Sequence, residues 1–170
     1  MTRVPLVLLL MLATGIGLHA QAGARRPEVA VRLLGSWAGT GVVTGRASTI
    51  TMTWADDMGG SFLHLRFRNV MAPNATRPED VFEGRGYYRV VGATATAGTG
   101  TWIDSRGAIM PLTVAVTADA FTTEWGSAAT ESGRTVYRVT GPDTMEVRDF
   151  VRAPDGQMRE FGLSTFRRVR

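Results

Sequence analysis

The sequence predicts an all-β protein, a single antiparallel up-and-down β-barrel of about ten strands with a short N-terminal helix. Short segments of alternating apolar and polar residues recur at near-regular spacing, and Pro, Asp, Asn and Gly residues separate them. No long helical pattern lies between these segments. A meander of this length removes its unpaired edges most simply by closing on itself.

The composition fits one globular domain in a chain of 170 residues. Hydrophobic residues make up 44% and charged residues 20%, so the chain can bury a sizeable core. Every basic residue is Arg, the net charge is +4, and the arginines are spread along the chain. A nucleic-acid groove needs a basic stripe, so we expect no nucleic-acid partner. The absence of Cys excludes disulfides and thiolate metal sites, and we expect neither a metal nor a cofactor.

Residues 1–22 have the features of a secretory signal peptide: a basic start, an apolar run, and small residues before the cut. We expect cleavage after Ala22, with Ala24 as a competing site, and export to the periplasm or medium. The alternative is an uncleaved anchor. No other apolar run is long enough to span a bilayer, so we expect no integral membrane segment after cleavage.

Residues 23–35 are predicted to form a flexible start and a short helix that covers one end of the barrel. Pro27 and Glu28 suit the first turn of a helix, and Val29 and Leu33 supply an apolar face.

Residues 36–170 contain the predicted strands. The first carries Trp37, Gly39 and Gly41 on one face, because side chains alternate along a strand. We interpret Trp37 as the floor of the barrel and the glycines as the start of a cavity or a tight bend. The expected strands span residues 36–44, 47–54, 61–70, 81–91, 94–103, 108–117, 120–125, 135–140, 145–152 and 158–169.

Three features together resemble the calycin superfamily of lipocalins and fatty-acid-binding proteins: Gly35-Ser36-Trp37, the ten-strand meander, and an Arg in the last strand. The resemblance implies that this Arg covers the Trp37 ring in a cation–π contact. Arg167 is the candidate, and Arg168 is the second choice. Residues 102–107, Trp-Ile-Asp-Ser-Arg-Gly, are similar to a hairpin of an uncharacterised bacterial lipocalin-like family.

The opening Leu-Leu-Gly-x-Trp-x-Gly at residues 33–39 is also similar to that of the nitrobindin-type haem barrels. Those barrels bind haem through a His late in the chain. Here His19 lies in the leader and no His follows His64, so we do not expect haem.

Two charged faces remain open to interpretation. His64, Arg66 and Arg68 share one face of the third expected strand, and a solvent-facing position is favoured over a cavity lining. Glu83 and Tyr87 in the next strand are weak catalytic candidates for acid–base chemistry, although outer ion pairs are the favoured interpretation. Asp149 has the parity of its apolar neighbours; if it is internal it needs a partner, for which Arg138 or Arg148 is available.

The expected function is binding of a small apolar or amphipathic molecule inside an exported, lipocalin-like barrel. One alternative is a cofactor-free lyase or isomerase acting in the barrel, and another is a solid structural or interaction barrel in the envelope. The expected ligand-binding residues are aromatic and Met side chains on inward parities: Trp37, Met52, Trp54, Trp102, Met110 and Trp125. Gly35, Trp37 and Arg167 are expected to be structural.

Overall fold

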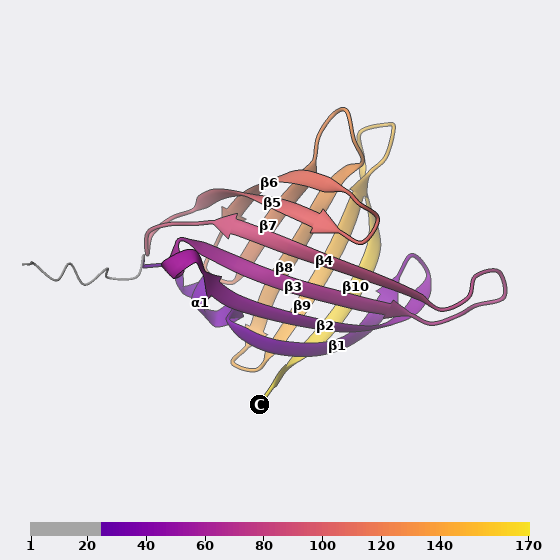
Figure 1. Cartoon of the computed structure of the whole chain (residues 1–170), viewed down its shortest axis with the longest axis horizontal. Helices are drawn as coiled ribbons and strands as arrows, with labels where there is room; N and C mark the ends of the chain where they lie inside the picture. Colours follow the sequence, from indigo (N-terminus) through magenta and orange to yellow (C-terminus); the bar gives the residue numbers. More distant parts are fainter. Residues whose placement is uncertain (1–24) are drawn as a thin grey trace, which may run out of the picture.

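The computed structural model describes residues 25–170, so the predicted signal peptide lies outside the described residues. These residues form the predicted closed antiparallel barrel, in which each strand pairs with the next and β1 pairs with β10 (Figure 1). The strands are β1 Gly35–Val43, β2 Arg46–Asp57, β3 Phe62–Met71, β4 Asp80–Arg89, β5 Ala97–Asp104, β6 Ile109–Val116, β7 Ala120–Gly126, β8 Ser132–Gly141, β9 Thr144–Arg152 and β10 Met158–Val169.

The predicted short helix is present as α1, Glu28–Leu33. It covers one end of the barrel, which we call the closed end (Figure 1). Val29, Ala30 and Leu33 are fully buried there. No helix of residues 25–170 is long and apolar enough to cross a membrane.

The opposite end, which we call the open end, carries the loops β1–β2, β3–β4, β5–β6, β7–β8 and β9–β10. The β3–β4 loop is the longest of these and projects well beyond the strands (Figure 1). Arg46 holds its base, since the guanidinium donates to the carbonyls of Met71, Ala72 and Pro78 at 2.5–3.0 Å.

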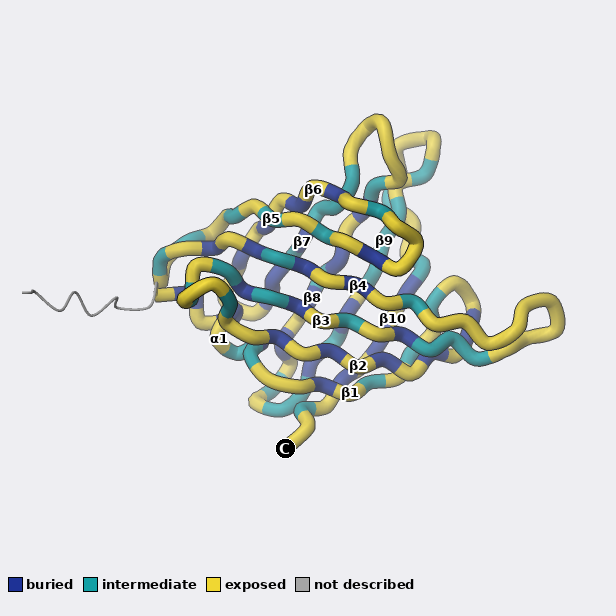
Figure 2. Tube along the Cα trace, viewed as in Figure 1, coloured by how far each residue is buried: buried dark blue, intermediate teal, exposed yellow. Residues whose placement is uncertain are grey.

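Burial alternates along most strands, as Figure 2 shows. In β2, Ile50, Met52 and Trp54 are buried while Thr51 and Thr53 are exposed, which confirms the predicted two-faced strand. The register shifts between Glu160 and Gly162 in β10. Such a bulge reverses which side chains face inward beyond it.

Candidate functional site

The barrel interior is hollow toward its open end, where a cavity of about 640 Å³ opens between the loops. Side chains from most strands line it, and residues of the open-end loops, Thr44, Arg77 and Arg106 among them, surround its mouth. A cavity of this size holds a drug-sized molecule. The interior is therefore not the solid scaffold of the third expected function.

Four packed aromatic rings close the cavity on the side that faces the closed end of the barrel. Trp54 stacks on Tyr88 with centroids 5.4 Å apart, and Tyr137 meets Trp54 edge-on at 5.1 Å. Phe121 meets both Trp54 and Tyr88 edge-on at 5.7 and 5.4 Å. We call these four residues the floor; Trp37, the expected floor of the barrel, is not one of them. Tyr88 and Tyr137 line the cavity, whereas Trp54 and Phe121 are buried and do not line it.

Two inward-facing glycines leave room for two Trp rings on the cavity wall. A Cβ on Gly84 would meet the Trp102 ring, and one on Gly133 would meet the Trp125 ring. Each indole therefore lies against a stretch of wall that has no side chain, and both rings line the cavity. The glycines expected to open the cavity behave differently, because Gly39 is covered by Phe166 and Gly41 by Ser164.

Asp149 is a carboxyl group on the cavity wall without a cationic partner. Its side chain lies beside Gly162, whose absent Cβ would come within 2.9 Å of Oδ2. Thr135 Oγ1 donates to Asp149 Oδ1 at 2.7 Å, and no Arg or His of residues 25–170 forms an ion pair with it. Both arginines considered as partners point outward, Arg138 to Asp119 and Arg148 to Glu146 and Glu160.

Desolvation raises the pKa of Asp149 to about 6, while the Thr135 hydrogen bond opposes the shift and the charge of Glu160 adds to it. Burial also raises the pKa values of Tyr88 and Tyr137, whose hydroxyl groups interact with each other. Near neutral pH the cavity thus contains two neutral phenols and one carboxyl group that exchanges a proton readily.

The mouth of the cavity carries most of its charge. Arg106 pairs with Asp104 at 3.0 Å and Glu131 at 3.5 Å, and its guanidinium lies 5.1 Å from the centroid of Phe82. Burial acts to raise the pKa of Asp104, but hydrogen bonds from Arg106 and Trp102 hold it below its ordinary value. Arg77, on the β3–β4 loop, lines the mouth and makes no ion pair within residues 25–170.

The structure divides the six expected ligand-binding residues into two groups. Trp102, Met110 and Trp125 line the cavity. Trp37, Met52 and Trp54 are buried near the closed end and do not line it.

The two catalytic candidates lie on the outer wall. Glu83 is exposed and pairs with Arg68 at 3.4 Å. Tyr87 stacks on His64, with ring centroids 4.6 Å apart. Neither side chain reaches the cavity, so neither can act on a molecule bound inside the barrel.

Arg168, not Arg167, covers the Trp37 ring, with its guanidinium carbon 4.3 Å from the centroid. The bulge at Glu160 and Gly162 accounts for this correction, because it places Phe161 and Arg168 inward and Arg167 outward. Gly35 takes a φ of 112°, and a Cβ there would come within 2.8 Å of the Arg168 guanidinium. Its expected structural role thus has a steric basis.

Sequence reasoning missed several residues that line the cavity, above all Thr135, Tyr137 and Asn69. Strict parity with Val139 in β8 places Thr135 and Tyr137 inward, so this signal was available. Asn69 shares the inward face of β3 with Leu63 and Leu65, and its Oδ1 has no hydrogen-bond partner among the described residues.

No protein-family model matches the chain, and no curated protein matches it in sequence. Several solved structures match the chain, among them two that share its barrel fold. The S-type phycobiliprotein lyase CPES from Guillardia theta superimposes with a TM-score of 0.57 at 11% identity, covering 83% of this chain and 90% of the lyase. Rv2717c from M. tuberculosis gives a TM-score of 0.56 at 19% identity, covering 82% and 94%. The protein is therefore a ten-strand barrel, consistent with the calycin architecture that its sequence resembles.

Proposed function

We propose that the barrel binds a small amphipathic molecule, which enters through the open end and lies between Trp102 and Trp125. The observation that carries this proposal is the aromatic-walled cavity of about 640 Å³ with an unneutralised carboxyl group on its wall. Aromatic walls supply apolar contact area, and a few convergent polar groups fix the orientation of a ligand.

The distribution of polar groups gives the ligand a direction. Asp149 and the two floor phenols offer hydrogen-bond acceptors and donors inside the cavity, and at the mouth lie Arg77 and Asp80, neither of which makes an ion pair within residues 25–170. A molecule with an N–H or O–H donor on its inserted part suits Asp149, and an acidic group at its outer end would pair with Arg77 on the side of the mouth away from Asp80. Asn69 Oδ1 provides a further unpartnered acceptor on the wall.

The comparisons with solved structures support the barrel architecture, and the chemistry of the proposal is argued from the residues that line the cavity. One barrel of this fold is a phycobiliprotein lyase. Function has to be argued from the cavity of this chain.

A fluorescence titration with 1-anilinonaphthalene-8-sulfonate tests the proposal, because this probe combines an aromatic body, an N–H donor and an acidic group. We expect saturable one-to-one binding with quenching of Trp emission. Met110→Trp places a large ring inside the cavity and should abolish binding, whereas Ile109→Trp places the same ring on the exposed face of the same strand and should not. Equal binding by the two variants would show that the probe sits outside the barrel.

Native mass spectrometry of the purified protein provides the second arm of this test. A molecule that is retained by the wild-type protein and by Ile109→Trp, but lost from Met110→Trp, identifies the natural ligand class. Wild-type protein that carries nothing and does not bind the probe contradicts the proposal.

We also propose that the protein acts outside the cytoplasm. A cut after Ala22 leaves every described contact in place, since the first of these comes from Arg25, whose carbonyl accepts a hydrogen bond from Gly92 at 2.8 Å. N-terminal sequencing of the protein from its source tests this. A chain beginning near residue 23 supports export, and a chain that retains residues 1–22 opposes cleavage.

A second candidate function is a cofactor-free lyase or isomerase in which Asp149, rather than Glu83, transfers the proton. Asp149 favours it, because a carboxyl group with a pKa of about 6 beside neutral phenols suits general acid–base catalysis. If the recovered ligand is converted by wild-type protein but only bound by Asp149→Asn, this function holds. If both proteins only bind it, the barrel is a carrier.

A further inference from the structure

The outer wall of β3 and β4 contains two arginines that face each other without a carboxylate between them. Arg66 and Arg85 are direct cross-strand partners. Both are exposed, and neither forms an ion pair within residues 25–170. Like charges at directly opposite positions repel each other, so this pair has a cost that the rest of the wall does not compensate.

The arginines of β8 and β9, on another part of the barrel wall, show the contrast. All four arginines of β8 and β9 have carboxylate partners: Arg134 and Arg152 with Glu124, Arg138 with Asp119, and Arg148 with Glu146 and Glu160. Arg89 and Arg167 also lack an ion pair among the described residues, but they lie opposite Thr99 and Ala38, whereas Arg66 and Arg85 lie directly opposite each other.

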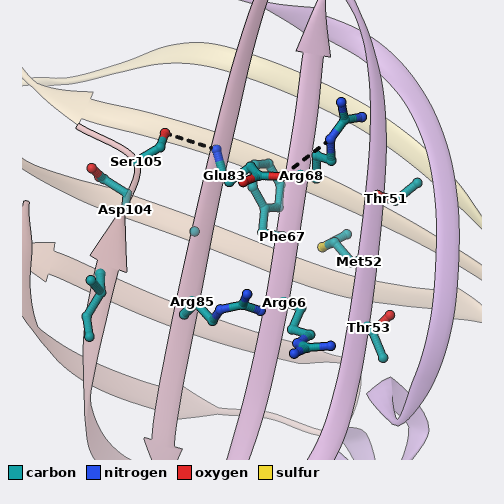
Figure 3. Close-up of a pocket in the computed structure, with 12 residues that line it drawn as sticks. Thr51, Met52, Thr53, Arg66, Phe67, Arg68, Glu83, Arg85, Asp104 and Ser105 are labelled. Carbon is teal, nitrogen blue, oxygen red and sulfur yellow. Dashed lines mark hydrogen bonds and ion pairs between the residues drawn. The ribbon is translucent and has the colours of Figure 1, made fainter. Parts of the chain in front are cut away.

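The two arginines lie in a groove of about 340 Å³ on the outside of the barrel. Figure 3 shows Arg85 reaching from β4 toward Arg66 on β3, with Thr51 and Thr53 on the neighbouring β2. Thr53 is the cross-strand partner of Arg66 and Thr51 that of Arg68. Thr53 Oγ1 lies 3.4 Å from Ser36 Oγ on β1, so the guanidinium groups are the donors of the groove and the threonines flank it.

The carboxylates near the groove are already engaged. Glu83 pairs with Arg68 at 3.4 Å, and the Asp104 side chain is fully buried and pairs with Arg106 at 3.0 Å. Two positive charges, those of Arg66 and Arg85, thus remain uncompensated. The pKa of His64 agrees with a positive local field: partial burial lowers it most, the charge of Asp57 opposes this, and the charges of Arg85 and Arg66 lower it further.

We propose that this outer groove binds the phosphate monoester group of a small soluble molecule. A phosphate monoester carries about −1.5 to −2 charges at neutral pH, which matches the two uncompensated guanidinium groups, whereas a carboxylate neutralises only one. Guanidinium groups bind such oxygens through paired hydrogen bonds. This site is on the outer wall and does not depend on the ligand of the barrel cavity.

Methyl phosphate, titrated into the ¹⁵N-labelled full chain at constant ionic strength, tests the proposal by NMR, with acetate as the comparison anion. We expect saturable shifts of the amide signals of Thr51, Thr53, Arg66 and Arg85 with methyl phosphate and much weaker effects with acetate. The double substitution Arg66→Gln with Arg85→Gln should weaken binding at least about tenfold, since charge-assisted hydrogen bonds are lost.

The matched control is Arg134→Gln with Arg138→Gln, which removes the same charge from a paired part of the wall and should leave the affinity unchanged. Arg66→Lys with Arg85→Lys keeps the charge but loses the paired geometry, and should bind more weakly than wild type. Thermal unfolding of each variant confirms that it folds, and we expect no loss of Tm when the repelling pair is removed.

Three results would overturn the proposal. One is the absence of saturable shifts with methyl phosphate. Another is an equal loss of affinity in the β3–β4 variant and the β8 control, which would indicate general charge attraction. The third is Arg66- and Arg85-dependent binding to vesicles of phosphatidylcholine and phosphatidic acid without binding of methyl phosphate, which would assign the wall to a membrane surface instead.

Discussion

The two ends of the barrel interior are built by the same strands but have opposite characters. β2 presents Met52 and Trp54 to the closed end, and Arg46 and Ser48 to the open end. β8 likewise has Val139 toward the closed end and Thr135 and Gly133 toward the open end. At the closed end rings and methyl groups fill the space, while at the open end Trp102 and Trp125 lie against glycines of the wall and leave a cavity between them.

This difference shows how one alternating pattern produces both a core and a binding site. Parity alone decides that a side chain points inward, and position along the strand decides whether it packs or lines a cavity. The floor marks the boundary between the two regions. Removing a Trp ring, or adding a methyl group, on each side of the floor tests that boundary.

The largest effect is expected for Trp54→Ala. Trp54 contacts Tyr88, Phe121 and Tyr137, so its loss leaves a cavity in a packed region and should lower the free energy of unfolding by about 3–5 kcal/mol. Trp125→Ala removes the same ring from the cavity wall and should cost about 1–2 kcal/mol, because that ring is packed on one side only. Urea unfolding of both variants measures the difference, and equal costs would contradict the division of the interior.

Arg168→Ala should come next, at about 2–3 kcal/mol. Arg168 donates to the carbonyls of Arg32 and Leu34, covers the Trp37 ring and pairs with Asp143 at 3.4 Å, so it fastens α1 to the closed end. Arg167→Ala is the matched control on the outer wall and should change stability by less than about 0.5 kcal/mol. A larger cost for Arg167 than for Arg168 would reverse the assignment.

Most of the fold could be predicted from the sequence, because periodicity and turn residues are local signals. The ten strands and α1 lie within a few residues of their expected positions. The Arg covering Trp37 was misplaced by one position because a bulge is set by pairing between strands and is not visible in either strand alone. The same limit applies to the ligand-binding residues: parity placed Trp37 and Trp54 inward, but only the tertiary structure shows that they lie below the floor. The favoured interpretation, outer ion pairing, holds for Glu83, which pairs with Arg68, whereas Tyr87 lies on the same outer face and stacks on His64.

Asp149→Asn should stabilise the protein at neutral pH by about 2 kcal/mol. The folded pKa of about 6 lies above the ordinary value of 3.8, so the folded state binds the proton more tightly than the unfolded state. This contribution is fully present below pH 3.8 and is lost as the pH rises through 6. The gain from Asn should therefore appear between these values and vanish in acid.

Thermal unfolding across the pH range measures this gain, with Glu146→Gln on the outer face of β9 as a control that should show no such pH-dependent gain. A gain that is the same at all pH values would mean that Asp149 does not carry the shifted pKa.

Gly84→Ala should have the smallest effect, about 1 kcal/mol, because the nearest atoms to the added methyl group belong to the Trp102 ring, which lines the open cavity and has space to shift. The same substitution at Gly39 should cost about 3 kcal/mol, since its methyl group meets the Phe166 ring and the Thr165 carbonyl in the filled part of the barrel. The two variants also differ in binding: Gly84→Ala pushes Trp102 into the ligand space and should weaken binding of the naphthalene probe, whereas Gly39→Ala should leave the affinity of the folded fraction unchanged. Urea unfolding together with probe titration separates these effects. If Gly84→Ala left probe affinity intact, Trp102 would not be part of the binding wall.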